Sequence, residues 1–582
     1  MNYFIFDNII YNKPHNNNYG REIKQLIGID SETYIDGTPF LFCTSDGHSF
    51  TLKDIPEIFF TRRYIDRHFA VYNLKFDSGS ILYGLSIQAL NILRQYGEVE
   101  IKDVKYSYIP HKRLRITKNN HGVTFWNIAQ FFKTSLENAS ALYLNKHKKE
   151  IGTKSFTRKY VTKHLPEIKK YCVQDAVLTA ELYDYFLLGL KKLKIVPTAL
   201  YSTASLSYQY FRQRIKIPDV WNIWCHHKYL LKLACYSYTG GKFEMISRGK
   251  FDGYNYDLNS AYPYEMSQLK SLDNARLVCR PVYMAGADYG FMKVCINNSD
   301  GMFLPCTIRP NGYNIYPAGV YYCTITKQEY DYLMELKIDV KIYSAFWIFC
   351  RSQYKPLYNT VTDLYKMKSE YKNIDKQKYS LCKILLNSYY GKMCQLVKKS
   401  DGEMLAGNCW QPIFASIITA NIRIKICKMQ NEYKKHIYAV HTDSILTDTP
   451  LPDKILSDNM GQWQLAGKGK GVVVACGIYQ IGDKYALRGF KTTDPRDLMT
   501  ILYDNDIQEG AILEQLNVKS WTESVFRNKK QLTNVFIYEN KILDYNQDIK
   551  RNWPNRVNGK WLLHNRQDSL PLLVVQRKNP FN

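Results

Sequence analysis

Residues 255–263 of this 582-residue chain read Asn255-Tyr256-Asp257-Leu258-Asn259-Ser260-Ala261-Tyr262-Pro263. The pattern predicts a strand that ends at the acidic Asp257 and turns directly into a helix. Backbone N–H groups at such a turn can bind phosphate oxygens, and a carboxylate beside them can hold a metal ion. The segment therefore predicts a phosphate site with Asp257 as its metal ligand.

A second segment lies further along the chain and reads Lys383-Ile384-Leu385-Leu386-Asn387-Ser388-Tyr389-Tyr390-Gly391-Lys392. It belongs to a helix that we expect over residues 376–395. Lys383, Asn387 and Tyr390 recur at i, i+4 and i+7, so they share one face of that helix. A lysine on this face can pair with the charge of a triphosphate, while Ile384, Leu385 and Tyr389 can supply a separate core face.

A third segment, Ile437-Tyr438-Ala439-Val440-His441-Thr442-Asp443-Ser444-Ile445-Leu446, is typical of a strand, a turn and a strand. Its turn holds Asp443. A second carboxylate of this kind is the natural partner of Asp257 for phosphoryl transfer with two metal ions. A helix is expected just before it, over residues 412–430.

Three acidic segments stand near the N-terminus. In Gly28-Ile29-Asp30-Ser31-Glu32-Thr33 the two acids lie at i and i+2 of an expected strand and point to the same face. The second segment, Asn73-Leu74-Lys75-Phe76-Asp77, follows another strand. The third, Tyr171-Cys172-Val173-Gln174-Asp175, lies in a helix expected over 166–188, where i and i+4 put phenol and carboxylate on one face. Four converging carboxylates could hold two divalent ions such as Mg²⁺.

The composition limits the class of protein. Lys and Arg exceed Asp and Glu by 26, which favours a polyanionic partner such as nucleic acid. No stretch reaches the ~18 apolar residues of a membrane span, and the first residues do not resemble a signal peptide. The 14 cysteines are scattered without a CxxC pair, which favours free thiols in a reducing cytoplasm. Short strands alternate with longer helices, which predicts a mixed α/β protein.

These motifs carry a family resemblance. The N-terminal segments resemble the DxE, NxxFD and YxxxD motifs of DnaQ-like 3′–5′ exonucleases. The later segments resemble motifs A (DxxSxYP), B (KxxxNSxYG) and C (DTDS) of family B DNA polymerases. The resemblance implies an RNase H-like exonuclease domain followed by a right-hand palm, fingers and thumb. It also implies two Mg²⁺ per active site, with Mn²⁺ as a substitute, and template-primer DNA and dNTPs as partners.

The resemblance assigns roles to individual residues. Tyr262 would lie under the incoming sugar, where its ring excludes a 2′-hydroxyl, and Tyr171 could orient the attacking water. The catalytic residues are Asp257, Asp443, Asp30, Glu32, Asp77, Asp175 and Tyr171. The metal ligands are these six acids together with Leu258. The nucleotide contacts are Leu258, Tyr262, Lys383, Asn387 and Tyr390. The DNA contacts are Tyr238, Gly240, Gly241, Asn73, Phe76, Ser135, Leu136, Thr442 and Tyr479.

Two features resemble the protein-primed branch of that family, found in small Bacillus phages, viruses and linear plasmids. Tyr238-Thr239-Gly240-Gly241 is similar to the YxGG motif between exonuclease and palm. The proline-rich segment 275–360 is similar to the first terminal-protein-region insertion, which contacts a protein primer. The expected partners then include a terminal protein that supplies the priming hydroxyl.

The expected domains follow the order of the motifs. They are the exonuclease domain at 1–195, a connecting region with the YxGG loop and the first part of the palm at 196–274, the insertion at 275–360, the fingers at 361–395, the second part of the palm at 396–490, and the thumb at 491–582. The interval between Gly391 and Ile418 is short, so the second terminal-protein-region insertion is expected to be truncated. That puts high processivity and strand displacement in doubt.

Two positions depart from the family pattern. Motif C has His441 where the family has an aspartate, which could alter metal preference or make activity pH-sensitive near the ordinary histidine pKa of ~6.5. The KxY motif keeps Tyr479 but lacks its lysine, for which Lys484 or Arg488 could substitute.

The sequence leaves three hypotheses. The first is a replicative polymerase with proofreading that starts on a terminal-protein hydroxyl. The second is a DNA-primed polymerase of the same family. The third is a catalytically weakened DNA-binding replication factor, for which His441 and the absent KxY lysine argue. In the first two cases we expect a monomer, encoded by a virus, phage or linear plasmid, that acts in the host cytoplasm without a membrane partner.

Overall fold

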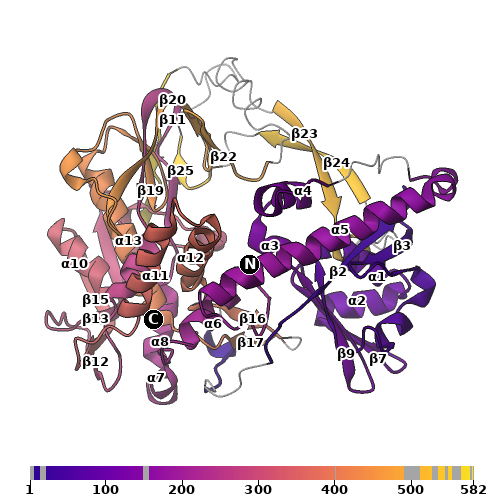
Figure 1. Ribbon diagram of the computed structural model, residues 1–582. Coiled ribbons are helices and arrows are strands. Elements are labelled where there is room, and N and C mark those ends of the chain that lie inside the picture. The colour runs from indigo at the N-terminus through magenta and orange to yellow at the C-terminus, as the bar shows by residue number, and fades with distance from the viewer. Residues whose placement is uncertain are drawn as a thin grey trace.

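The computed structural model describes residues 6–13, 21–148, 156–399, 402–490, 511–526, 535–543, 548–553, 565–576 and 580. Strands and helices alternate along these residues, so the mixed α/β prediction is confirmed. Figure 1 shows an N-terminal body, in indigo and purple, beside a second body built from the later residues. The long helix α5 (Arg158–Lys192) runs along the N-terminal body toward the second one.

An eight-stranded mixed sheet forms the N-terminal body, in the order β4-β3-β2-β5-β9-β8-β7-β6. Strand β5 pairs in parallel with both β2 and β9, and the other neighbours are antiparallel. Its apolar face forms a core with helices α1 (Leu74–Ile81) and α2 (Ile87–Tyr96). The strands are β2 (Ile27–Thr33), β3 (Pro39–Thr44), β4 (Ser49–Phe50), β5 (His68–Val71), β6 (Glu98–Ile101), β7 (Val104–Ile109), β8 (Arg113–Lys118) and β9 (His121–Asn127).

Helix α5 starts eight residues before the expected position at Pro166. Thr157 caps it, because its side-chain oxygen accepts a hydrogen bond from the backbone N–H of Tyr160. The helix kinks at His164, where φ is −115°. Proline disfavours helical geometry in preceding residues and removes one backbone donor, so Pro166 bends this helix rather than starting it.

Gly28 allows α5 to approach strand β2 very closely. A Cβ atom at Gly28 would lie 1.8 Å from the backbone oxygen of Ala176 and 3.1 Å from the backbone nitrogen of Ala180. No side chain can occupy that space unless the helix moves. The separation of β2 from α5 therefore depends on a residue without a side chain.

We expect Gly28→Ala to lower the free energy of unfolding by about 1–3 kcal/mol, because the added methyl group overpacks the contact between β2 and α5. Urea denaturation of the full chain measures the change. Gly84→Ala is the matched control, since a Cβ there meets nothing within 4 Å. Equal stability of the two variants would contradict the inferred close packing.

A second sheet, the central sheet, has the order β10-β18-β19-β11-β20-β21-β22, and β26 pairs with β11 off this path. Helices α9 (Ala261–Gln268) and α13 (Pro412–Glu432) pack together beside it, and the buried α13 contributes many side chains to the largest core. The helix and hairpin expected at 412–430 and 437–446 are thus confirmed. The strands are β10 (Lys242–Met245), β11 (Ser247–Leu258), β18 (Ile437–Thr442), β19 (Ser444–Thr447), β20 (Trp463–Ala475), β21 (Ile478–Ile481), β22 (Lys484–Leu487) and β26 (Gln567–Asp568).

The expected insertion at 275–360 folds mostly into a third sheet, the lateral sheet, of order β12-β15-β13-β14-β28. Its apolar side chains and helix α10 (Lys327–Glu335) form a separate core. The strands are β12 (Arg276–Cys279), β13 (Tyr289–Asn298), β14 (Ala318–Thr326), β15 (Asp339–Phe349) and the C-terminal β28 (Leu573–Val575).

Two neighbouring helices, α11 (Tyr358–Tyr371) and α12 (Lys376–Ser388), occupy most of the region expected to be fingers. Helix α12 ends seven residues before the expected limit at Gln395. The chain tightens there into a 3₁₀ turn, Tyr390–Lys392, around Gly391, a residue of low helix propensity. Tyr390 consequently lies just beyond the α-helix that carries Lys383 and Asn387.

Helices also link the N-terminal and central sheets. They are α6 (Thr203–Arg212), α7 (Trp221–His226) and α8 (Lys228–Ser237). In the region of the expected truncated insertion, β16 (Leu396–Lys398) and β17 (Met404–Ala406) form a short hairpin, and the N-terminal β1 (Ile9–Ile10) adds a parallel third strand.

The described parts of the expected thumb, residues 491–582, contact three regions. Strands β23 (Ala511–Lys519) and β24 (Val535–Leu543) form a two-stranded antiparallel sheet above the N-terminal body (Figure 1). Helix α15 (Trp521–Phe526) packs on that body, where the buried Trp521 donates a hydrogen bond to Ser78 Oγ at 3.2 Å. Strands β26 and β28 instead pair with β11 and β14, so the C-terminal residues belong to the central and lateral sheets. The remaining parts of the expected thumb lie outside the described residues.

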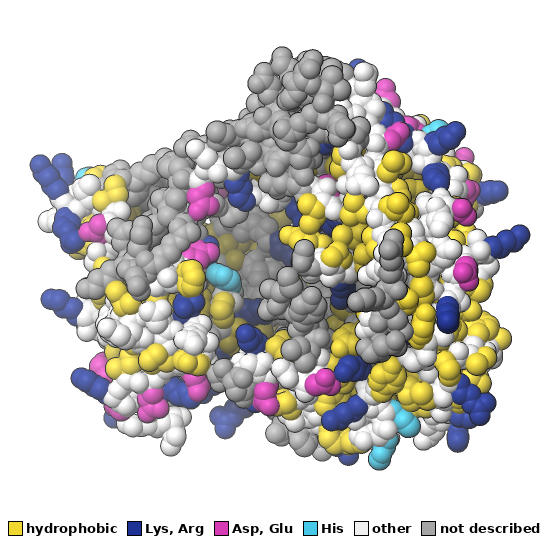
Figure 2. Space-filling model, turned by 180° about the vertical axis from the view of Figure 1, so that it is seen from behind, with side chains coloured by type: hydrophobic (Ala, Val, Ile, Leu, Met, Phe, Trp, Pro, Cys, Tyr) yellow, Lys and Arg dark blue, Asp and Glu magenta, His cyan; other side chains and the backbone are white. Residues whose placement is uncertain are grey.

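The many Lys and Arg residues of the sequence are visible on the surface of the molecule. Seen from behind, Lys and Arg side chains are spread over both bodies, and the surface is hollowed between them (Figure 2). Among the helices that the structure describes, none has both the length and the apolar character needed to cross a bilayer.

Candidate active sites

The structure brings together the four N-terminal acids, here called the acidic cluster: Asp30, Glu32, Asp77 and Asp175. Strand β2 carries Asp30 and Glu32, α1 carries Asp77, and α5 carries Asp175. Ser31 lies between the first two acids and donates a hydrogen bond from Oγ to Asp77 Oδ1 at 2.6 Å. Three elements far apart in the sequence thus place their carboxylates in one buried site.

The four carboxylates of the acidic cluster repel one another strongly when no cation lies between them. Burial, followed by the charges of neighbouring acids, raises the pKa of Asp30 well above its usual range. Burial is also the main cause that raises the pKa of Glu32 to about 8 and that of Asp77 to about 7. Asp175 Oδ1 is buried and has no hydrogen-bond partner among the described residues. Buried carboxylates with free oxygen donors fit divalent ions such as Mg²⁺, whose charge would offset this repulsion.

We expect the metal-free protein to lose stability as the pH rises from 4.5, the ordinary pKa of Glu32, to about 8. Acids whose pKa is raised by folding bind more protons in the folded than in the unfolded state, so deprotonation favours unfolding. The loss should be on the order of a few kcal/mol. Thermal unfolding in EDTA at several pH values tests this, and added Mg²⁺ should restore stability at pH 8.

The matched variant for this measurement is Glu32→Gln, which keeps the shape of the side chain but cannot ionise. Its stability should decline less between pH 4.5 and 8 than that of the wild type. An identical decline in both proteins would show that Glu32 does not titrate with the inferred raised pKa.

Tyr171 lies beside the acidic cluster, as the helical spacing with Asp175 predicts, and Lys148 joins them. The Lys148 ammonium pairs with Asp175 Oδ2 and lies 4.7 Å from the centre of the Tyr171 ring. Burial opposes the charge on Lys148, but Asp175 outweighs it and raises the pKa of this lysine. Lys148 was not predicted from the sequence, because a lysine far from any motif has no local pattern that marks it.

The expected contacts for single-stranded DNA lie at the rim of the acidic cluster. Asn73 is the exposed N-cap residue of α1, and Phe76 is half-buried in its first turn. Ser135 caps the short helix α4 (Leu136–Ala139), of which Leu136 is the first residue. The Tyr72 hydroxyl ties the two segments together by donating to the backbone oxygens of Thr134 and Ser135 at 2.9 and 3.2 Å.

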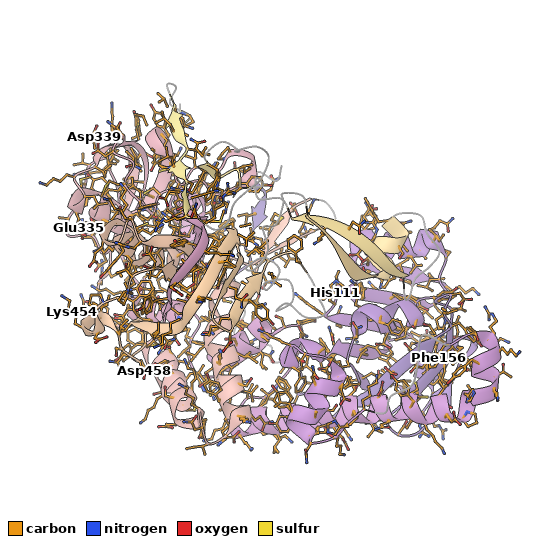
Figure 3. All side chains as sticks on the ribbon, turned by 90° about the horizontal axis from the view of Figure 1, so that it is seen from above. His111, Phe156, Glu335, Asp339, Lys454 and Asp458 are labelled. Carbon is orange, nitrogen blue, oxygen red and sulfur yellow. The ribbon has the colours of Figure 1, made fainter. Side chains whose placement is uncertain are left out.

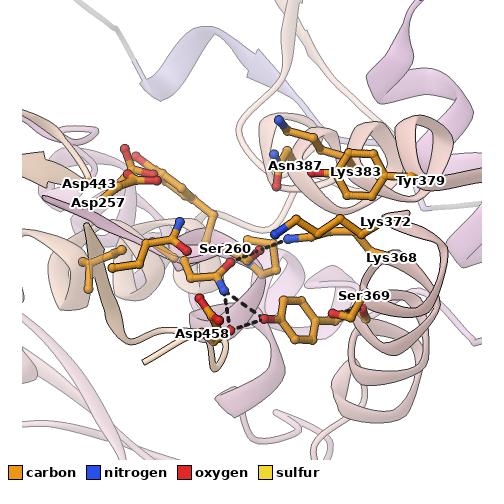
Figure 4. Close-up of a pocket in the computed structure, with 17 residues that line it drawn as sticks. Asp257, Ser260, Lys368, Ser369, Lys372, Tyr379, Lys383, Asn387, Asp443 and Asp458 are labelled. Atoms are coloured by element: carbon orange, nitrogen blue, oxygen red, sulfur yellow. Dashed lines mark hydrogen bonds between the residues drawn. The ribbon is translucent and has the colours of Figure 1, made fainter. Parts of the chain in front are cut away.

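A cavity of about 530 Å³, the central pocket, holds the two later acids (Figure 4). Asp257 is the second-last residue of β11, and Asp443 lies in the turn between β18 and β19. The backbone N–H of Leu258 donates to the backbone oxygen of Asp443 at 2.9 Å, which holds the two strand ends together. Burial and the charge of Asp257 raise the pKa of Asp443 to about 7. As in the acidic cluster, the two carboxylates fit a divalent cation.

Lysines from α11 and α12 face the two acids across the central pocket. Lys383 and Asn387 line it from α12, as the sequence predicts. Lys368 and Lys372, which the sequence analysis missed, line it from α11, and Lys368 donates to Ser260 Oγ at 3.0 Å (Figure 4). Burial and the charges of neighbouring lysines lower the pKa of Lys368. Concentrated positive charge opposite two carboxylates suits a metal-bound polyphosphate.

Three tyrosines from separate motifs meet beside the central pocket. The rings of Tyr262 and Tyr390 lie 4.7 Å apart, and the Tyr390 hydroxyl donates to that of Tyr238 at 2.8 Å. Gly241 makes room for them, since a Cβ there would lie 2.5 Å from Thr442 Cγ2 and 3.0 Å from the Tyr262 hydroxyl.

The loop with Tyr238 and Gly240 is held by side chains of the lateral sheet region and of α13. Arg309 donates to the backbone oxygen of Tyr238, and Asn314 donates to that of Thr239 at 2.6 Å. The buried Arg423 of α13 donates to the backbone oxygen of Gly240 at 2.6 Å. The segment 275–360 therefore reaches the edge of the central pocket.

His441 lies in a stack of aromatic rings. Its ring is stacked on that of Tyr479, with centres 4.7 Å apart, and lies 5.0 Å from the Phe243 ring, which is tilted by 55°. Burial, helped by the charge of Arg488, lowers the pKa of His441 to about 4. The structure therefore gives no support to a pH sensitivity at the ordinary histidine pKa of ~6.5, because burial among rings disfavours the charged imidazolium.

Thr442 and the hairpin β21–β22 complete the surroundings of the two acids. Thr442 adopts a φ of 66° at the turn that presents Asp443. Lys484 and Arg488 are the two candidates for the missing KxY lysine. Burial raises the pKa of Asp257, and the positive charge of Lys484 opposes that rise. Arg488 lies over the Phe243 ring at 4.7 Å instead. The charge of Lys484 thus acts on Asp257, whereas that of Arg488 acts on His441.

The two candidate sites belong to different bodies. In the view from above, Asp458, which lines the central pocket, lies in the second body, whereas His111 and Phe156 lie in the N-terminal body (Figure 3). One chain thus offers two separate sets of carboxylates.

Comparison with known proteins points to one class of enzyme. Residues 150–406 match the family model described as DNA polymerase type B, organellar and viral. The DNA polymerase of Acidianus bottle-shaped virus (isolate Italy/Pozzuoli) is 23% identical over 505 residues, which cover 77% of this chain and 73% of that protein. Probable DNA polymerases of Ascobolus immersus and Neurospora intermedia are 24% and 22% identical and match over 50% and 62% of this chain. The chain spans 28% and 40% of the lengths of these two fungal relatives.

Solved structures show the same likeness in three dimensions. Phi29 DNA polymerase complexed with primer-template DNA and incoming nucleotide superposes with a TM-score of 0.64 at 15% identity, over 90% of this chain and 100% of that one. Its complex with single-stranded DNA gives a TM-score of 0.59 at 14% identity, over 85% and 97%. The chain therefore has the fold of phi29 DNA polymerase.

Proposed function

We propose that the chain is a DNA-directed DNA polymerase of the type B class, with a separate 3′–5′ exonuclease site for proofreading. The observation that carries the proposal is the central pocket, in which Asp257 and Asp443 face Lys368, Lys372 and Lys383. Two acids opposite a cluster of lysines suit the transfer of a nucleotide from a triphosphate. The central sheet would be the palm, and helices α11 and α12 would be the fingers. The N-terminal body would be the exonuclease domain.

The proposed mechanism assigns a task to each side chain. Asp257 and Asp443, with Leu258, would hold Mg²⁺, or Mn²⁺ in its place, which lowers the charge barrier to attack by the primer hydroxyl. Lys383 and the two lysines of α11 would bind the triphosphate oxygens. Tyr262, backed by Tyr390, would lie under the sugar and exclude a 2′-hydroxyl.

The acidic cluster would carry the exonuclease reaction. Its four acids would hold divalent ions, which activate water and stabilise the leaving oxygen. Tyr171 would orient the attacking water, and Lys148 would hold Asp175 in place through their ion pair. Asn73, Phe76, Ser135 and Leu136 would contact the single-stranded primer end.

Protein priming is the finer part of the proposal. The segment 275–360 is a folded unit with its own core, and Arg309 and Asn314 connect it to the loop at Tyr238. Such a unit beside the central pocket could receive a terminal protein that offers a hydroxyl as primer. We further propose a monomeric enzyme of viral, phage or linear-plasmid origin that acts in the host cytoplasm. The short β16–β17 hairpin supports limited processivity.

The test uses a labelled primer on a longer template with Mg²⁺. We expect extension when dNTPs are present and shortening of the primer when they are absent, and binding should weaken steeply with salt. Absence of both activities would overturn the proposal and favour a non-catalytic DNA-binding factor. Transfer of a labelled nucleotide to a co-encoded protein, without a DNA primer, separates protein priming from DNA priming.

A further inference from the structure

A thiol lies at the acidic cluster. Cys172 is buried on α5, three residues before Asp175, and its Sγ is 3.6 Å from the backbone oxygen of Asp30. One carboxylate oxygen of Asp30, one of Glu32 and the Cys172 Sγ all lie within 4.8 Å of one another. Catalysis by two metal ions that are held by carboxylate oxygens does not require this sulfur atom.

A further donor points to a bound cation at the same place. The Asp175 side chain is almost fully buried, and its Oδ1 has no hydrogen-bond partner among the described residues, although Oδ2 pairs with Lys148. Asp175 follows Cys172 at i+3 on α5, so the two side chains lie on the same side of that helix. A buried oxygen of this kind needs a partner, which a cation can supply.

We propose that Cys172 makes the acidic cluster a mixed carboxylate and thiolate site that accepts a thiophilic divalent cation, such as Zn²⁺ or Cd²⁺, in competition with Mg²⁺. Thiolate sulfur is a soft ligand that selects such ions, whereas Mg²⁺ binds oxygen. A tetrahedral site with ordinary Zn–S and Zn–O bonds places its donors about 3.6 Å apart, within reach of small side-chain rotations.

The consequence rests on the proposed exonuclease function. Among the described residues that line the central pocket, there is no cysteine. A thiophilic ion should therefore displace Mg²⁺ from the acidic cluster at concentrations that leave the central pocket active. Zn²⁺ would then inhibit primer shortening before it inhibits primer extension, and proofreading would respond to the supply of thiophilic metal.

The test is a titration of the metal-free full chain with Cd²⁺, followed by calorimetry and by the ultraviolet charge-transfer absorbance of Cd–thiolate bonds. We expect Cys172→Ser and Cys172→Ala to lose one equivalent of this absorbance and to weaken binding at that site at least about tenfold. Glu32→Gln should weaken the same site. The control is Cys235→Ser, because Cys235 is a buried cysteine of α8 and is not one of the three donors.

Unchanged Cd²⁺ stoichiometry and affinity in both Cys172 variants would overturn the inference, as would an equal loss in Cys235→Ser. The binding readout does not depend on exonuclease activity. A Cys172-dependent absorbance in a chain that never shortens primers would support the metal site and refute the exonuclease proposal. Shortening with equal Zn²⁺ sensitivity in wild type and Cys172→Ser would support the exonuclease and refute the role of the thiol.

Discussion

Asp443→Asn should abolish primer extension, with a loss of at least about 10³-fold in rate, and leave primer shortening intact. The substitution keeps the shape of the side chain and the backbone contact with Leu258 but removes the charge that would hold a divalent ion. Such an ion contributes several kcal/mol to phosphoryl transfer, and each 1.36 kcal/mol corresponds to tenfold in rate. Single-turnover extension of a labelled primer measures the effect.

The control for Asp443→Asn is Asp252→Asn, an exposed carboxylate five residues before Asp257 on the same strand. It should extend primers at the wild-type rate. Because burial and Asp257 raise the pKa of Asp443 to about 7, the neutral amide should not destabilise the metal-free fold. Full extension activity in a folded Asp443→Asn protein would refute the assignment of the central pocket.

Asp30→Asn should have the opposite phenotype, with primer shortening reduced at least about 10³-fold and extension retained. Asp30 is the member of the acidic cluster on which the charges of Glu32, Asp77 and Asp175 all act. Asp30→Asn removes a charged ligand from the acidic cluster. A divalent ion contributes several kcal/mol to phosphoryl transfer here too, so the expected loss in rate is the same as for Asp443→Asn. Shortening of a labelled single strand without dNTPs measures the loss.

The control for Asp30→Asn is Glu100→Gln, an exposed acid on strand β6 of the same sheet. It should leave both activities unchanged. The two variants Asp443→Asn and Asp30→Asn together test whether the activities reside in separate bodies. Loss of both activities in either variant would contradict independent sites.

Local sequence patterns predicted many of the neighbouring side chains in the acidic cluster and in the central pocket. Alternation along a strand placed Asp30 and Glu32 on one face, and helical spacing placed Tyr171 beside Asp175. The turn at Asp443 and the shared face of Lys383 and Asn387 were predictable for the same reason. In each case the periodicity of a single element decides which side chains share a face, and that periodicity is visible in adjacent residues.

Local patterns were less successful where an element ends. Helix α12 stops before Tyr390, and α5 begins ahead of Pro166. Tyr390 nevertheless contacts Tyr262 and Tyr238 from its place in the 3₁₀ turn. Helix ends depend on packing as well as on propensity, so spacing alone places them to within a few residues.

By itself, the sequence determined the mixed α/β class and the order of the motifs, and it nominated the six acids, because each depends on residues close together in the chain. Only the tertiary structure decided which distant groups meet these acids. Lys148 pairs with Asp175, Lys368 and Lys372 face Asp257, and Cys172 lies beside Asp30. The tertiary structure also buries His441, which favours its neutral form. It pairs β26 with the central sheet and β28 with the lateral sheet. The physical reason is that burial and contacts between remote segments set pKa values and donor sets, and a linear sequence carries no local signal for either.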